Sequence, residues 1–201
     1  MISEQLAVAF IAFAAATLFT PGPNNIMLMA SGLNYGFRRT LPHVAGVTIG
    51  FSFLVAVIGL GLGAVFAAYP VLHTILKYGG AAYLIYLAIV IALSGPSDTD
   101  RAGERKPMTF LGAAMFQWVN VKGWVIAVGA ITAYAAIAAY PLNIAALSIL
   151  LFVIGLGSSL TWVLLGTSLQ ALVKSPRAVR IFNVVMALLL LASLYPVLKE
   201  P

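Results

Sequence analysis

The stretch TPGPNN, from Thr20 to Asn25, interrupts an apolar segment and decides how the chain folds. Apolar residues precede this stretch and resume at Ile26. Pro21 and Pro23 donate no backbone N–H, so carbonyls one turn earlier lose their helical partners. Because an uncovered carbonyl in hydrocarbon costs several kcal/mol, a membrane tolerates such a break only where it lines a polar cavity.

The composition indicates a membrane protein with several spans. Of the 201 residues, 62% are hydrophobic and 8% are charged, and the mean hydropathy is +1.05. Soluble domains carry roughly 25% charged residues. The net charge of +6 arises from basic residues in short loops, which indicates membrane orientation rather than nucleic-acid binding. The absence of cysteine excludes disulfides and thiolate metal sites.

Six apolar runs are long enough to cross a bilayer, which takes about 20 residues. The sequence therefore predicts an all-α membrane protein with six transmembrane helices. The runs cover residues 5–34, 42–68, 71–93, 108–136, 143–172 and 178–197.

Basic residues gather in alternate loops between these runs, and the opposite loops hold no Lys or Arg. By the positive-inside rule the basic loops face the cytoplasm and both termini face outward. The basic loop residues are Arg38 and Arg39, then Arg101, Arg105 and Lys106, then Lys174, Arg177 and Arg180.

The chain divides into halves of three spans each, about 1–94 and 107–201, joined by the hydrophilic linker 94–107. We interpret the linker as a solvated hinge rather than a regulatory loop. With an odd number of spans per half, a structural repeat must be inverted, as in many secondary transporters. We therefore expect one transporter domain, residues 1–201, built as a 3+3 inverted repeat.

The first span of each half contains a polar interruption. In the first span the helix-break residues are Pro21, Gly22 and Pro23, and in the fourth the interruption runs from Gln117 to Trp124. Paired interruptions in corresponding segments indicate a transport site. We therefore expect helices 1 and 4 to be broken and to face one another.

Polar residues at these interruptions are the candidate substrate ligands. Lys122 is the only charged residue deep in a span, where a lysine costs about 2.5–3.5 kcal/mol. It either faces an aqueous cavity and binds a carboxylate or snorkels to the outer interface; nearby Asn120 and Gln117 favour the cavity. Asn24 and Asn25 begin a half-helix whose free N–H groups suit a carboxylate, although their amides can also cover the freed carbonyls.

Other residues in the spans are assigned to cavity walls, to the membrane interface or to helix packing. Trp124 is a candidate wall of the cavity, with an interfacial anchor as the alternative. His43 is expected to be interfacial rather than a proton relay, and Asn183 to serve helix packing. The glycines expected to permit close helix packing, within the chain or in a homodimer, are Gly46, Gly50, Gly155 and Gly157.

The distribution of acidic residues excludes several functions. No carboxylate lies inside a predicted span, so proton coupling through a buried Asp or Glu and a carboxylate-rich metal site are both excluded. No catalytic set of residues is present either. We therefore predict no enzymatic activity, no cofactor and no metal. The five acidic residues are Glu4, Asp98, Asp100, Glu104 and Glu200.

Motifs along nearly the whole chain resemble those of the LysE/RhtB family of amino-acid exporters. They are Pro21-Gly22-Pro23-Asn24, Gly36-Phe37-Arg38-Arg39 with Ala45-Gly46-x3-Gly50, Gly79-Gly80-Ala81-Ala82-Tyr83-Leu84, and Phe116-x3-Asn120-Val121-Lys122. Asn24 stands where the family often has Asp, and Val121 replaces the proline of its Asn-Pro-Lys motif. With these differences the chain resembles the branch that contains cysteine and O-acetylserine exporters.

The resemblance implies a bacterial inner-membrane exporter of small neutral amino acids, driven by proton motive force. Together with the residues above, it predicts a secondary transporter surrounded by lipid, with an amino-acid substrate and no nucleic-acid partner. The alternative is a non-transporting membrane scaffold or subunit that binds a partner protein or lipid.

Overall fold

The computed structural model describes residues 3–69, 71–94, 106–173 and 175–199, and the regular elements in these ranges are all helices. The predicted all-α class is confirmed. Most of the linker 94–107 lies outside the described residues. The elements are α1 (Glu4–Phe19), α2 (Pro23–Tyr35), α3 (Phe37–Val57), the π-helical η1 (Ile58–Leu62), α4 (Gly63–Ala68), α5 (Val71–Ala92), α6 (Phe110–Phe116), α7 (Val121–Ala133), the 3-10 turn η2 (Ala135–Ile137), α8 (Leu142–Leu172), α9 (Pro176–Ala192) and α10 (Leu194–Lys199).

Both predicted interruptions are present as bends. The α1–α2 pair bends by 55° and the α6–α7 pair by 64°. Continuous helices long and apolar enough to cross a membrane cover Phe37–Phe66, Thr74–Ala92 and Leu142–Gln170, and the first of them is kinked at Gly61. With each bent pair counted as one span, the described residues contain up to five spans. The sixth predicted run corresponds to α9, of 17 residues, and α10, and its crossing stays a prediction.

Local sequence explains each break. Gly22 has an extended backbone and caps α2, whose first residue is Pro23, a position where the missing N–H removes no helical hydrogen bond. The second break has no proline. There the N–H groups of Trp118 and Val119 bond to carbonyls three residues earlier, which tightens the end of α6. Asn120 then takes an extended conformation and caps α7.

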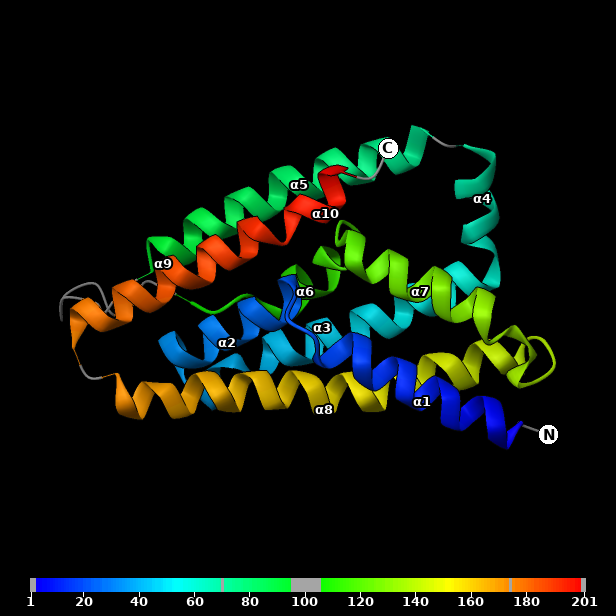
Figure 1. Ribbon diagram of the computed structural model, residues 1–201, viewed down its shortest axis with the longest axis horizontal. Coiled ribbons are helices and arrows are strands. Elements are labelled where there is room, and N and C mark those ends of the chain that lie inside the picture. The colour runs from blue at the N-terminus through cyan, green and yellow to red at the C-terminus, as the bar shows by residue number, and fades with distance from the viewer. Residues whose placement is uncertain (1–2, 70, 95–105, 174, 200–201) are drawn as a thin grey trace.

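The helices pack in layers around these breaks. Figure 1 shows α5 beside α9 on one side of the molecule and α8 on the other, with the α1–α2 and α6–α7 breaks between them. The outside of the bundle is apolar: Phe53 is 58% exposed, Leu111 64% and Val153 59%. Gln117 and Asn183, by contrast, are fully buried. This inside-out distribution suits a lipid environment.

Glycines permit several close backbone contacts, including those of α3 with α6 and of α2 with α8. A Cβ at Gly50 would lie 2.6 Å from the Cα of Ala114, and one at Gly46 would overlap the Phe110 carbonyl, so α3 and α6 meet at these glycines. Similarly, a Cβ at Gly166 of α8 would overlap the carbonyl oxygen of Met29 in α2.

The other two glycines that the sequence indicated for packing make no close approach. A Cβ at Gly155 would lie 3.8 Å from its nearest neighbour, and one at Gly157 would meet nothing within 4 Å. On α8 the tight contact is made at Gly166, about three turns beyond Gly155.

Gly166→Ala is expected to lower the thermal unfolding temperature of the purified protein in detergent. The added methyl would push α8 away from the backbone of α2, and overpacking of this kind costs about 1–3 kcal/mol. Gly157→Ala is the matched control, since its methyl meets open space and alanine favours helix. Equal unfolding temperatures for the two variants would contradict the close α2–α8 contact.

Candidate functional site

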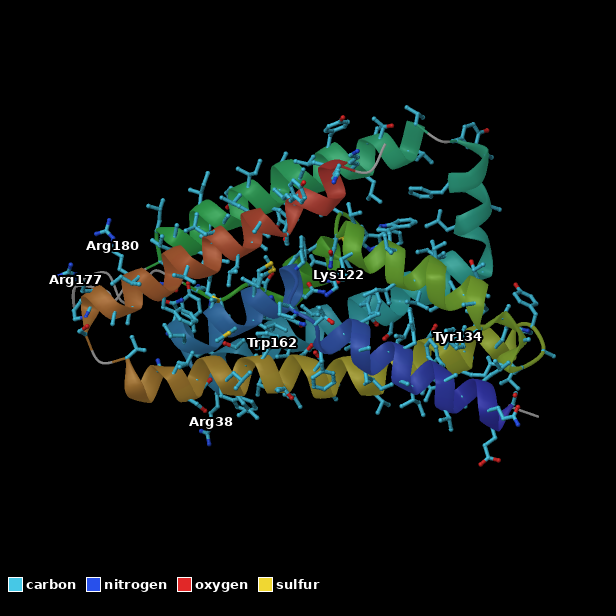
Figure 2. All side chains as sticks on the ribbon, viewed as in Figure 1. Arg38, Lys122, Tyr134, Trp162, Arg177 and Arg180 are labelled. Carbon is cyan, nitrogen blue, oxygen red and sulfur yellow. The ribbon has the colours of Figure 1, made fainter. Side chains whose placement is uncertain are left out.

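The two helix breaks meet at Lys122. Its half-buried side chain leaves the first turn of α7, and Nζ donates to the carbonyl oxygens of Thr20 at 3.0 Å and Pro21 at 3.4 Å. Figure 2 shows Lys122 near the middle of the molecule, far from the labelled arginines at one end. A Cβ at Gly22 would lie 2.8 Å from Nζ. The lysine therefore points into the opposite break instead of snorkelling to an interface.

Side chains cover the carbonyls that the first break leaves without helical partners. Asn25 Nδ2 donates to the carbonyl oxygens of Leu18 at 2.7 Å and Thr20 at 2.9 Å. Ser158 of α8 donates a second hydrogen bond to Leu18, at 2.8 Å. Asn25 thus covers carbonyls freed at the break, which is the structural alternative expected for it, and stabilises the break.

An amide pair links the two breaks. Asn24 Nδ2 donates to Gln117 Oε1 at 2.9 Å, and Gln117 Nε2 donates back to Asn24 Oδ1 at 3.1 Å. Gln117 Nε2 also donates to the Ala113 carbonyl at 2.9 Å. The pair ties the start of α2 to the end of α6, so the two breaks keep a fixed separation.

Two cavities flank the Lys122 side chain, and among the described residues no acidic side chain lines either of them. Gly22, Asn120 and Lys122 contribute to the walls of both. The smaller, of about 40 Å³, is also lined by Thr17, Leu18, Asn24, Asn25, Phe51, Gly123 and Ile126. The larger, of about 380 Å³, is also lined by Thr20, Pro21, Pro23, Leu84, Val121, Val125, Ala192 and Ser193.

Asn120 offers an acceptor without a protein partner. The residue is 3% exposed, and its Oδ1 is buried with no hydrogen bond to any described group. A buried acceptor left in this way costs about 1–3 kcal/mol, and such groups in native proteins are nearly always satisfied by protein, water or ligand. Because Asn120 lines both cavities, a bound cationic donor would satisfy it.

The N-termini of two half-helices add donors to the same place. Neither Gly22 nor Asn120, the caps of α2 and α7, makes a side-chain capping bond. The first N–H groups of both helices therefore remain available, and a helix N-terminus favours negative charge. Together with the Lys122 ammonium they form a region suited to an anion, on the same cavities as Asn120. The arrangement matches the two charges of a zwitterion.

Two of the residues predicted to bind substrate lie outside both cavity walls. Trp124 is buried, donates through Nε1 to the Trp118 carbonyl at 3.1 Å and stacks on Phe66 with ring centroids 4.2 Å apart. Gln117 is fully buried in the amide pair with Asn24. The structure thus brings Asn24, Asn25, Asn120 and Lys122 together around the cavities. It places Trp124 in the core and Gln117 in the amide pair that links the breaks.

Several wall residues gave no signal in the sequence. Thr17, Phe51 and Ile126 line the smaller cavity, but each is one residue of a long apolar run that offers no indication of which face is inward. Ser158 lies in a small-residue cluster that indicated helix packing alone, yet its hydroxyl supports the break.

The interfacial depth predicted for His43 stays a prediction. Its side chain, however, is 2% exposed and lies inside the bundle. The reason is that α3 begins at Phe37, earlier than the apolar run that starts at residue 42, so His43 is nearly two turns inside the helix.

Comparison with known proteins adds three findings. The model of a family described as LysE type translocator matches residues 15–193. A cysteine/O-acetylserine efflux protein of Escherichia coli O139:H28 (strain E24377A / ETEC) is 34% identical over 192 residues, which cover 94% of this chain and 96% of the relative. Proteins of the same name from Escherichia coli (strain K12) and Shigella sonnei (strain Ss046) are each 34% identical over 191 residues. The alignments cover 94% of this chain and 95% of each relative. No solved structure matches.

Proposed function

We propose that this chain, which belongs to the LysE type translocator family, exports small neutral amino acids or close derivatives from bacterial cells. Family membership makes it a multi-pass inner-membrane transporter rather than an enzyme. Relatives named for cysteine and O-acetylserine efflux, aligned over 94% of the chain, support substrates of that size. The observation that carries the proposal is the position of Lys122 and the unpartnered Asn120 oxygen on the same cavities.

Substrate binding would exchange the partners of Lys122. Its ammonium is bound by the neutral carbonyls of Thr20 and Pro21, and a carboxylate is the stronger acceptor because it is charged. A substrate carboxylate would therefore draw the ammonium away, with help from the free N–H groups of α2 and α7. The released carbonyls and Asn120 Oδ1 would then accept from the substrate's own ammonium.

The cavity walls favour a small uncharged side chain. Phe51 and Ile126 are apolar, and no acidic residue of the walls could pair with a basic side chain. A second positive charge would also be repelled by Lys122. Neutral amino acids are accordingly preferred over lysine or arginine.

Exchange of partners also links binding to movement. When Lys122 leaves the carbonyls of Thr20 and Pro21, one of the contacts between the two breaks is lost while the Asn24–Gln117 pair remains. The end of α1 can then shift relative to α7. We include proton motive force as the driving force and outward-facing termini, following the family resemblance and the basic loops. A homodimer is not part of the proposal, since Gly46 and Gly50 are occupied in contacts within the chain.

Export is tested in bacteria that lack their own cysteine and O-acetylserine exporters. Expression of this chain is expected to raise tolerance to cysteine and to increase O-acetylserine in the medium several-fold. A panel that includes lysine and arginine measures the predicted preference for neutral substrates. Unchanged tolerance and unchanged medium content, with the protein present in the membrane, would favour the scaffold alternative instead.

A further inference from the structure

A third cavity, separate from the two at the helix breaks, lies between α2, α3 and α5. Its volume is about 80 Å³, several times the roughly 10–15 Å³ that one buried water needs. It shares no lining residue with the cavities around Lys122. Its polar wall consists of Ser31, Asn34, Tyr35, His43, Ser94 and Lys106.

His43 is the feature of this cavity that points to a ligand. The side chain is 2% exposed, and neither Nδ1 nor Nε2 has a hydrogen-bond partner among the described residues. A neutral imidazole carries one donor and one acceptor, and leaving both unpaired in the interior is costly. Because buried polar groups in native proteins nearly always have partners, a polar molecule in the cavity is expected to bind the ring.

The groups around His43 are already paired with one another and form a fixed wall. Asn34 donates to Asn183 Oδ1 at 2.7 Å and accepts from Asn183 Nδ2 at 2.9 Å, and Asn183 also donates to the Ser94 carbonyl at 2.6 Å. The Ser31 and Thr40 hydroxyls bond to each other at 3.1 Å. These bonds leave the imidazole as the free polar group in the depth of the cavity.

Lys106 gives the cavity a cation at its exposed end. It is the charged residue that faces the cavity, while Met27, Leu87 and Met108 supply apolar walls. An ammonium at the mouth, an imidazole with a lone pair inside and an apolar wall between them suit a small zwitterion with an uncharged side chain. This is the chemistry of the Lys122 site built from different residues.

The cavity lies on the side of the protein where export would begin. Lys106 belongs to a basic loop predicted to face the cytoplasm. Figure 2 shows Arg177 and Arg180 at one end of the molecule, with Arg38 also on that side of Lys122. Along α2, Asn34 is ten residues beyond Asn24, a separation of about 15 Å. One small amino acid cannot contact both places.

We propose that this cavity is a second binding site for a small zwitterionic amino acid, which loads there from the cytoplasm before it reaches Lys122. The inference rests on the proposed function, since the ligand is the exported substrate. His43 accepts from the substrate ammonium, and Lys106 binds its carboxylate.

The test counts bound O-acetyl-L-serine. Equilibrium binding of the labelled compound is measured on the purified full-length protein, the variants Lys122→Met and His43→Phe, and the double variant. Ligand-induced rise in unfolding temperature is recorded in parallel. We expect two molecules bound per chain in the wild type, one in each single variant and none in the double variant, with a thermal shift that persists in Lys122→Met.

Lys106→Met provides a second variant at the same cavity and is expected to weaken the inner site about tenfold. Arg38→Met is its matched control, because it removes an exposed charge at the same end of the protein that does not line the cavity. One molecule bound to the wild type, lost in Lys122→Met and unaffected by His43→Phe and Lys106→Met, would overturn the second site and leave the proposed function intact. No binding and no thermal shift with any neutral amino acid would overturn both.

Discussion

Replacing Lys122 with methionine is expected to lower the initial rate of amino-acid efflux by about 100-fold or more, while the protein still inserts and folds. Methionine keeps the length of the side chain but removes the ammonium that binds Thr20, Pro21 and, on the proposed account, the substrate carboxylate. Charge-assisted hydrogen bonds contribute about 1.5–3 kcal/mol each, and every 1.4 kcal/mol is tenfold in affinity. Efflux of labelled substrate from proteoliposomes with a pH gradient measures the rate.

Lys77→Met is the matched control for this variant. Lys77 is also a lysine of an apolar helix, but it lies on α5 and lines neither cavity around Lys122. Its replacement is expected to leave the efflux rate within about twofold of the wild type, since it changes no wall of either cavity around Lys122. An equal loss in both variants would show that Lys122 matters only as a basic residue of the chain.

Asn120→Leu is expected to reduce export about 10- to 100-fold and, at the same time, to leave thermal stability unchanged or higher. The substitution removes the acceptor proposed for the substrate ammonium. It also removes a buried oxygen that has no protein partner, and replacing an unpaired polar group by an apolar one of similar shape is neutral or stabilising. Efflux rate and unfolding temperature are measured on the same preparation.

A loss of export without a loss of thermal stability would distinguish a substrate-binding role of Asn120 from a structural one. If Asn120 instead held the helices together, its loss would lower the unfolding temperature along with export. Asn25→Leu serves as the comparison, because Asn25 covers the carbonyls of Leu18 and Thr20. That variant is expected to lose stability, since it leaves two carbonyls at the break uncovered.

The positions of the helix breaks follow from local chemistry, which is why the sequence predicts them. Two prolines at residues 21 and 23 cannot continue a helix in any environment, and Gln117 and Asn120 are polar residues in an apolar run. The fourth-span break forms even with Val121 in place of proline, because Gln117 and Asn120 find partners or a cavity there. The same local chemistry predicts which polar residues at the two breaks are candidate ligands.

The sequence could not predict the hydrogen-bond and packing partners of these residues, because the partners depend on how the helices face one another. Apolar residues surround α8 and α5 on all sides, so periodicity does not separate lipid-facing from inward positions. The pairing of Asn24 with Gln117, the close contact at Gly166 and the burial of His43 arise from helix rotation and register. Trp124 similarly packs on Phe66 instead of lining a cavity. Its position is determined by tertiary contacts that the sequence does not show.

The central claim, that Lys122 binds the carboxylate of the substrate, is tested most directly by a cycle that changes both partners. Binding of O-acetyl-L-serine and of its carboxamide, which lacks the negative charge, is compared in the wild type and in Lys122→Met. To isolate this site, both proteins also carry His43→Phe. The account predicts that the protein with Lys122 prefers the acid about 10- to 100-fold and that the protein with methionine shows no preference. An undiminished preference for the acid in the methionine variant would contradict it.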